Sequence, residues 1–275
     1  MDAGYRGTVN PDLRLVAADM DGTLLDAEGR VPDRLWPLLE IMRERGILFV
    51  PASGRQYATL RTLFARAAAG MPFIAENGTY VVRDDVEISS APLDADTVRA
   101  VIAALAGTPA DYGIVICGRD RAWVSRTDDA FLGEVDKYYV VHEVIADLDA
   151  VADQAIKIAV FCFGDAETEI APALAGFRAT HQVVVSGAAW VDVMDARVNK
   201  GEALRALQDA LGIGPEHSAA FGDYLNDLEM LQAVEWSYAM DNAHPDVKAV
   251  ARSLAPHHHD EGVIEVLGEL LGVEV

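Results

Sequence analysis

Short apolar runs alternate along the chain with longer segments whose apolar residues recur at helical spacing. The runs at residues 13–19 and 46–53 are almost wholly apolar, which is typical of strands covered on both faces of a parallel sheet. Between them, residues 33–46 show helical spacing and close with Gly46, a residue favoured at helix ends. These segments predict a strand, a helix and a second, parallel strand.

A third strand and a hairpin follow, and the last part of the chain repeats the alternation of strands and helices. Residues 72–78 predict the third short strand and residues 79–90 the hairpin. Farther on, the pattern predicts helices at 200–211, from about 225, at 245–251 and at 261–271, with strands at 218–223, 236–240 and 253–255. Ligands of open parallel sheets bind beyond the carboxyl ends of the strands, so residues at those ends are candidates for a functional site.

The middle of the chain has a different pattern. After a helix at 94–107, paired short strands and further helical stretches continue to about residue 190, which indicates an α+β unit with antiparallel strands. The sequence therefore predicts an α/β fold with a doubly wound parallel-sheet core built from both ends of the chain. We expect this core at residues 1–80 and 191–275, and an inserted domain at 81–190.

Composition and charge narrow the function classes. The 275 residues are enough for two domains, and 51% of them are hydrophobic, as is ordinary for a soluble protein. The 22 lysine and arginine residues against 44 aspartate and glutamate residues give a net charge of −22. This charge disfavours nucleic acid and anionic membranes as partners, but it does not exclude a small anionic substrate bound in a locally positive pocket.

The number of cysteines and the lengths of the apolar stretches indicate the cellular compartment of the protein. Cys117 and Cys162 are too few for a disulfide framework and have no metal-ligand spacing, so we expect two reduced core cysteines. No apolar stretch approaches the roughly 20 residues that span a bilayer, and residues 1–12 lack the apolar core of a signal peptide. We expect a soluble cytoplasmic protein.

Asp19 and Asp21 follow the first predicted strand and precede Gly22 and Thr23. Two close carboxylates repel each other unless a cation lies between them or one holds a proton. A calcium-binding EF-hand loop is excluded because it requires glycine at its sixth position, whereas glycine is fourth here. Asp19 and Asp21 could simply cap a turn. The functional alternatives are that one is a metal-bound nucleophile or that one is a general acid.

Two other segments favour an anion. Ser53 and Gly54 lie between a strand and a helix, where backbone N–H groups attract negative charge, although a serine there can simply cap the helix. Lys200 lies in the first turn of a predicted helix, where a cation opposes the helix dipole. A nearby anion would compensate; the alternative is a solvated lysine.

Asp223 ends a predicted strand, and Asn226 and Asp227 follow at the start of a helix. Helix capping explains Asn226 or Asp227 better than it explains Asp223, which stands earlier. Carboxylates at a strand end suit a hard cation such as Mg²⁺, which keeps water or phosphate oxygens in its other positions. Together, the four segments provide carboxylates for a metal, groups for an anion and a spare acid, and this combination favours phosphoryl transfer.

At these residues the chain resembles the haloacid dehalogenase superfamily, and within it the Cof-type sugar phosphatases with a large inserted cap (type C2B, subfamily IIB). The resemblance covers nearly the whole chain and rests on the segments "DMDGTLLD", "ASGR", "ENGTY", "VNKGEAL", "FGDYLNDLEML" and "AMDNAHPDVKAVA". It implies a Rossmann-like core with a cap that closes over the substrate.

The resemblance also implies a role for each site residue. Asp19 would attack phosphorus to form an aspartyl-phosphate, and Asp21 would protonate the leaving alcohol and later activate water. Phosphate would be held by Ser53, Lys200 and Asn226, with Gly54 beside them. The Mg²⁺ ligands would be Asp19, the backbone carbonyl of Asp21 and Asp223, with Asp227 supporting them.

The expected function is a Mg²⁺-dependent phosphatase of small phosphomonoesters, above all sugar phosphates. Retention of Asp21 favours a phosphatase or phosphomutase over a dehalogenase or ATPase. The alternatives are a phosphomutase on the same core and a phosphosugar-binding protein without catalysis. We expect a small-molecule phosphoester as partner, and a monomer or small homo-oligomer.

Three further features have no role in this scheme. Arg55 and Asn77 are close enough to the expected site to contact phosphate or substrate. The three histidines at 257–259 suggest a metal site, but neighbouring residues of one loop point in different directions and no further ligand follows at suitable spacing. We interpret them as a solvated loop.

Overall fold

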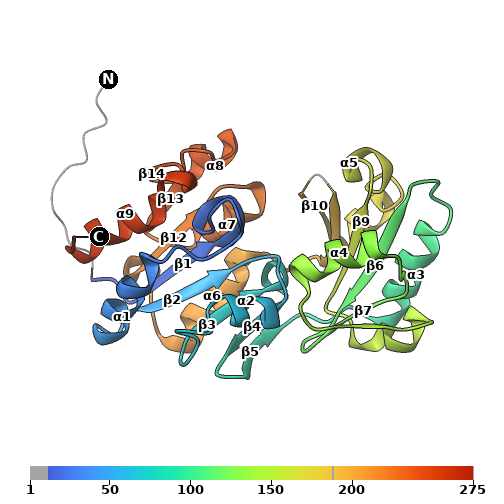
Figure 1. The fold of residues 1–275 in the computed structure, drawn as a ribbon, viewed down its shortest axis with the longest axis horizontal. Helices are drawn as coiled ribbons and strands as arrows, with labels where there is room; N and C mark the ends of the chain where they lie inside the picture. The colour runs from blue at the N-terminus through green and yellow to red at the C-terminus, as the bar shows by residue number, and fades with distance from the viewer. Residues whose placement is uncertain (1–11, 188, 275) are drawn as a thin grey trace.

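The fold contains two sheets, which lie in separate parts of the molecule (Figure 1). The computed structural model describes residues 12–187 and 189–274. The N-terminal stretch for which the sequence predicts no signal peptide lies almost wholly outside the described residues. Within the described residues, no helix is both long and apolar enough to cross a membrane.

The larger sheet has eight strands in the order β14-β13-β12-β1-β2-β3-β4-β5. Its parallel strands are β1 (Leu15–Asp19), β2 (Leu48–Ala52), β3 (Pro72–Ala75), β12 (Ser218–Gly222), β13 (Trp236–Met240) and β14 (Ser253–Ala255). The antiparallel strands β4 (Tyr80–Arg83) and β5 (Val86–Ser90) form the predicted hairpin at one edge. Strand β1 is fully buried between β2 and β12, as its continuous apolar run predicts.

Helices pack on this sheet in a doubly wound arrangement. They are α1 (Leu35–Glu44), α2 (Tyr57–Leu63), α6 (Lys200–Leu211), α7 (Leu228–Gln232), α8 (Pro245–Val250) and α9 (Gly262–Leu271). Helix α1 packs against α9, and α6 packs against α7. The α/β core predicted from the two ends of the chain is thereby confirmed.

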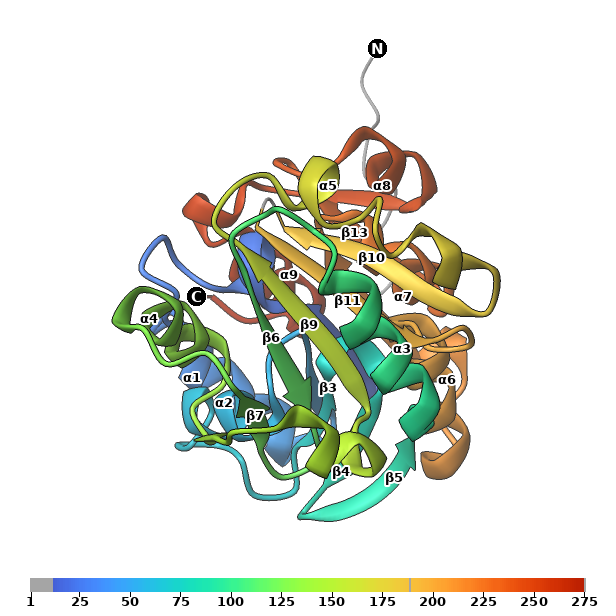
Figure 2. The same cartoon turned by 90° about the vertical axis from the view of Figure 1, so that its right-hand side faces the viewer.

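The smaller sheet has six strands in the order β10-β11-β9-β6-β7-β8, and it faces the viewer in Figure 2. Its elements are α3 (Ala95–Leu105), β6 (Tyr112–Cys117), β7 (Ala122–Val124), α4 (Asp129–Tyr138), β8 (His142–Val144), β9 (Lys157–Cys162), α5 (Ala166–Glu169), β10 (His181–Gly187) and β11 (Trp190–Asp195). All pairs are antiparallel except β7 with β8. We call this unit the cap.

The sheets suggest different limits for the cap from those that the sequence predicts. Strand β5 pairs with β4 in the core sheet, and β11 pairs with β9 and β10 in the cap sheet. We therefore propose that the cap runs from about residue 91 to about residue 197. The two cysteines are buried and unpaired in the cap, as expected.

Candidate active site

Residues from three neighbouring strands meet at one edge of the core sheet. Asp19 ends β1, Ser53 follows β2, and Asp223 follows β12. Because these strands are parallel and adjacent, their carboxyl ends lie together, and the three side chains border one cavity. The strand pattern alone therefore explains why residues 200 positions apart share a site.

Three carboxylates form a cluster at this edge. Asp19, Asp223 and Asp227 each place one oxygen within 4.8 Å of the others. Asp227 is fully buried, and its Oδ2 accepts hydrogen bonds from the backbone N–H groups of Asp223 (2.9 Å) and Tyr224 (3.2 Å). Hard oxygen donors of this kind fit Mg²⁺, so these residues could hold such a metal.

Two neighbouring carboxylates account for the presence of a cation, Lys200, in the first turn of α6. Its Nζ lies 2.5 Å from Asp19 Oδ1 and 2.7 Å from Asp227 Oδ1, and the side chain is buried. Although burial opposes the charge, these two carboxylates raise the pKa of Lys200 above its ordinary value. Asn199 caps the same helix by accepting a hydrogen bond from Glu202 N (2.8 Å), so α6 begins at the site.

The acids of the cluster have altered proton affinities. Burial raises the pKa of Asp19 well above its usual range, and Asp227 and Asp223 add to this effect while Lys200 opposes it. Burial and the neighbouring Asp227 also raise the pKa of Asp223 to about 6. Additional positive charge at this position would therefore favour the ionised carboxylates.

Asp21 stands apart from the cluster. Its carboxylate pairs with Arg55 in a two-pronged ion pair, with Nε to Oδ2 at 2.8 Å and Nη2 to Oδ1 at 2.5 Å. The Asp21 side chain is 52% exposed, and it lines the same cavity as Asp19. Directly after Asp21 the chain turns at Gly22 (φ +83°), where a Cβ would lie only 2.4 Å from Asp223 Oδ2.

Of the groups expected to hold an anion, Ser53, Gly54 and Asn226 line the cavity, and Lys200 lies within the carboxylate cluster. Ser53 Oγ accepts a hydrogen bond from Arg55 N (3.1 Å), and Gly54 follows in the same loop. Asn226 Nδ2 donates to Asn77 Oδ1 (3.1 Å), and both side chains line the cavity. Arg55 and Asn77, which the sequence placed near the site, are therefore part of its wall.

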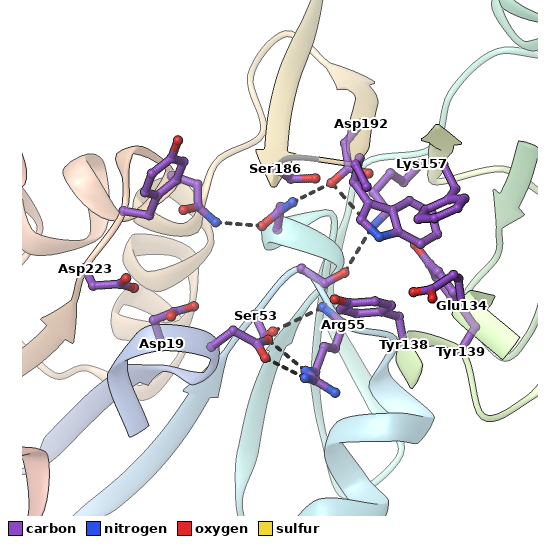
Figure 3. A pocket seen from close by; sticks show the side chains of 18 residues that line it. Asp19, Ser53, Arg55, Glu134, Tyr138, Tyr139, Lys157, Ser186, Asp192 and Asp223 are labelled. Carbon is purple, nitrogen blue, oxygen red and sulfur yellow. Dashed lines mark hydrogen bonds and ion pairs between the residues drawn. The ribbon is translucent and has the colours of Figure 1, made fainter. Parts of the chain in front are cut away.

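The cavity lies between core and cap and has a volume of about 530 Å³ (Figure 3). The cap contributes residues that sequence reasoning missed. Among them, Lys157 Nζ lies 2.6 Å from Glu76 Oε2 and 3.7 Å from Asp192 Oδ2, and Asp192 Oδ2 accepts from Asn77 Nδ2 (2.8 Å). The available signal was a lysine in the otherwise apolar strand at 156–163.

The three histidines differ from the predicted arrangement. His257, His258 and His259 place ring nitrogens within 4.8 Å of one another, although they are consecutive. A tight turn causes this, because His257 Nδ1 accepts a hydrogen bond from His259 N (3.1 Å). The expectation that the rings point in different directions was therefore wrong, while the loop is partly exposed as predicted.

Comparisons relate the chain to known proteins over most of its length. A family profile described as haloacid dehalogenase-like hydrolase matches residues 16–267. The 5-amino-6-(5-phospho-D-ribitylamino)uracil phosphatase YbjI of Escherichia coli K12 is 32% identical over 94% of this chain and 96% of its own. An HMP-PP phosphatase of Enterobacter sp. is 30% identical over 86% of this chain and 87% of its own.

Solved structures show the same fold. The crystal structure of SMU.1108c from Streptococcus mutans UA159 has a TM-score of 0.85 and 25% identity, over 94% of this chain and 99% of that one. A haloacid dehalogenase-like hydrolase from Bacteroides thetaiotaomicron has a TM-score of 0.83 at 21% identity, over 94% and 99%. With a profile that matches most of its length, the chain belongs to the haloacid dehalogenase-like hydrolases.

Proposed function

We propose that the protein is a Mg²⁺-dependent phosphatase that hydrolyses small phosphomonoesters through an aspartyl-phosphate on Asp19. The observation that carries this proposal is the pairing of a buried carboxylate, Asp19, with the Lys200 ammonium at 2.5 Å, beside two further carboxylates. A second acid, Asp21, borders the same cavity. This set combines a nucleophile, positive charge for a phosphoryl group and a proton donor.

The residues would act in two steps. In the first, an Asp19 oxygen bonds to phosphorus as the ester P–O bond breaks, and Asp21 gives its proton to the leaving oxygen. In the second, Asp21 takes a proton from water as the water oxygen bonds to phosphorus, which releases Asp19 and inorganic phosphate.

The other residues would position the phosphoryl group. Lys200, Ser53 and Asn226 hold its oxygens, with the backbone of Gly54 beside them. Mg²⁺, when held by Asp19, Asp223, Asp227 and the backbone carbonyl of Asp21, supplies positive charge that offsets the charge of the reacting phosphoryl group.

The substrate would be a phosphate ester of a sugar or polyol. The Escherichia coli relative is named for a substrate with a phosphorylated ribityl group, which is a polyol phosphate. The cavity volume of about 530 Å³ has room for such a molecule between core and cap.

The test is phosphate release from sugar phosphates, polyol phosphates and a generic aryl phosphate, with Mg²⁺ and with a chelator. We expect metal-dependent release that falls on the order of 10³-fold or more in Asp19→Asn, because the amide is a poor nucleophile. Asp209→Asn, an exposed change at the far end of α6, should keep wild-type rates. Undiminished release in Asp19→Asn would refute the proposed nucleophile, and isomer formation without phosphate release would indicate a mutase.

A further inference from the structure

Three polar side chains form a hydrogen-bonded chain from the cap to the core (Figure 3). Asn77 Nδ2 donates to Asp192 Oδ2 (2.8 Å), and Asn226 Nδ2 donates to Asn77 Oδ1 (3.1 Å). Asp192 lies on β11 of the cap, whereas Asn77 and Asn226 belong to the core, and all three line the cavity. The chain therefore connects a cap carboxylate to Asn226, which we propose as a ligand of the phosphoryl group.

The carboxylate end determines the direction of both hydrogen bonds. Asp192 is buried, and its Oδ2 lies 3.7 Å from Lys157 Nζ. Because a carboxylate beside an ammonium group only accepts hydrogen bonds, Asn77 must present its NH₂ group to Asp192. Asn77 Oδ1 then faces Asn226, which must present Nδ2 in turn. An amide turned the other way would bring two acceptors together, which is costly for buried groups.

The backbone holds the Asn77 side chain against the loop that contains Ser53 and Gly54. Glu76 (φ +51°) and Asn77 (φ +58°) both have left-handed backbone, which is uncommon outside glycine but is tolerated by asparagine. Asn77 N donates to Ser53 O (2.9 Å), and Glu76 N donates to Arg55 O (3.0 Å). A Cβ on Gly54 would lie 3.1 Å from both amide atoms of Asn77. The amide is thus fixed in position, and its direction is left to its hydrogen-bond partners.

The direction of the Asn226 amide matters to an anion in the cavity. Its Nδ2 carries two hydrogens, and Asn77 Oδ1 accepts one of them, which leaves the second to donate to a phosphoryl oxygen. In the reversed amide, the carbonyl oxygen would take the place of this donor and repel a phosphoryl oxygen. A hydrogen bond to a charged group contributes more than one between neutral groups, so a reversal would weaken anion binding.

We propose that Asp192 is a positioning residue for phosphoryl binding: through Asn77, it sets the direction in which the Asn226 amide donates to a phosphoryl oxygen. Asp192 itself contacts neither the phosphoryl group nor the reacting atoms. Because Asp192 belongs to the cap, the amide of Asn226 is oriented only while cap and core are in contact. This inference rests on the proposed phosphatase function and adds a residue of the cap to the binding of the phosphoryl group.

The test is calorimetric titration with inorganic phosphate in the presence of Mg²⁺. Asp192→Asn keeps the shape of the side chain, but its amide donates as well as accepts, so both directions of the chain are allowed. We expect the Kd for phosphate to rise about tenfold in this variant. Asp195→Asn is the matched control: it lies on the same strand outside the cavity, pairs with Arg197 at the surface, and should bind phosphate as the wild type does.

A double-mutant cycle separates positioning from general stability. In an Asn226→Ala background no amide is left to orient, so Asp192→Asn should change the Kd for phosphate less than about twofold. A tenfold effect in that background would show that Asp192 acts by another route. If Asp192→Asn fails to fold, Asn77→Gly serves in its place, because glycine keeps the left-handed backbone and removes the connecting amide. It should weaken phosphate binding to a similar extent, and wild-type affinity would overturn the inference.

The outcomes separate this inference from the proposed function. Undiminished phosphate affinity in a folded Asp192→Asn variant overturns the positioning role and leaves the phosphatase intact. If the wild-type protein hydrolyses no ester, the phosphatase proposal fails, and the Kd for phosphate still supports or overturns the role of Asp192. If the wild-type protein does not bind phosphate either, both proposals are overturned.

Discussion

Asp223 combines a raised pKa with a place among the three carboxylates that could hold a metal. It follows β12, accepts a hydrogen bond from Thr23 Oγ1 (3.0 Å), and lies against Asp19 and Asp227. Its pKa of about 6 exceeds the ordinary value of 3.8, so the folded chain holds this proton more firmly than the unfolded chain. The stabilisation from this group is complete below about pH 4 and disappears as the pH rises through about 6.

This shift predicts a pH-dependent response to Mg²⁺. At pH 7.5 the ionised carboxylates repel one another, and a bound cation relieves the repulsion, whereas at pH 5.0 a proton competes for Asp223. Mg²⁺ at about a hundred times its Kd should raise Tm by several degrees at pH 7.5 and by less at pH 5.0. Thermal unfolding with Mg²⁺ and with a chelator at both pH values measures this.

Asp223→Asn serves as the control for that experiment. It removes the group whose proton competes with the metal, so the difference between the two pH values should shrink along with the overall Mg²⁺ effect. An equal rise in Tm at both pH values for the wild-type protein would contradict the role of Asp223.

At this scale, sequence reasoning identified the residues next to strand ends and missed those brought together by the cap. Asp19, Ser53, Lys200 and Asp223 could be predicted because each lies where a predicted strand or helix ends or begins. The cluster of Glu76, Lys157 and Asp192 could not be predicted, because no local sequence pattern indicates that a lysine on a cap strand contacts a loop of the core.

Helix α6 shows how far a sequence pattern determines an element. Its bounds, Lys200–Leu211, agree with the predicted 200–211, because Asn199 caps its start and Gly212 (φ +62°) ends it. Strand β8 (His142–Val144) was not predicted, because its residues are partly exposed and it pairs only with β7 at the sheet edge. Local signals thus located buried elements better than exposed ones.

The contact between α6 and α7 depends on Gly201. A Cβ at this position would lie 2.4 Å from the backbone carbonyl atoms of Glu229, next to the start of α7. Gly201→Ala should therefore lower the free energy of unfolding by about 1–3 kcal/mol, because backbone must move. Denaturant unfolding of the metal-free protein measures the change.

Gly133 provides a control for Gly201, because it is also a glycine within a helix. It lies in α4, it is exposed, and a Cβ there would meet no atom within 4 Å. Gly133→Ala should leave stability unchanged or raise it by about 0.5–1 kcal/mol, since alanine is the better helix former. A loss in both variants of equal size would show that packing against α7 is not the cause.

Core and cap are connected by buried polar contacts as well as by the chain. Gln56 of the core exchanges two hydrogen bonds with the backbone of Val141 in the cap, at 3.0 and 3.1 Å. Lys157 of the cap contacts Glu76 and Gly54 of the core, and it is 1% exposed. Burial opposes the charge of Lys157, but Asp192 and Glu76 more than compensate and raise its pKa.

Removal of this lysine should therefore destabilise the whole molecule. Lys157→Met leaves the buried carboxylates of Glu76 and Asp192 without a cation, and we expect a loss of about 3–5 kcal/mol in the free energy of unfolding. Lys137→Met breaks an exposed pair with Glu134 and should cost about 0–1 kcal/mol. Equal losses in the two variants would show that the buried contacts of Lys157 between core and cap stabilise the protein no more than an exposed ion pair does.

At the scale of the whole molecule, the insertion of one domain into another could be predicted because the periodicity changes and then returns. The position of the cap over the site could not, because it depends on side chains such as Gln56 and Lys157 that meet only in the folded protein. The resemblance to a known family implied closure, and the cavity between core and cap has walls from both.

The order of the strands has a consequence for biosynthesis. The ribosome makes β1 to β5 first, then the entire cap, and only then β12, which pairs with β1 across about 200 residues. The nascent chain therefore carries one edge of β1 without its partner until the last quarter emerges, while the six cap strands are all available earlier. Asp19 cannot meet Asp223 and Asp227 before this last part of the chain emerges, so the carboxylate cluster is complete only near the end of translation.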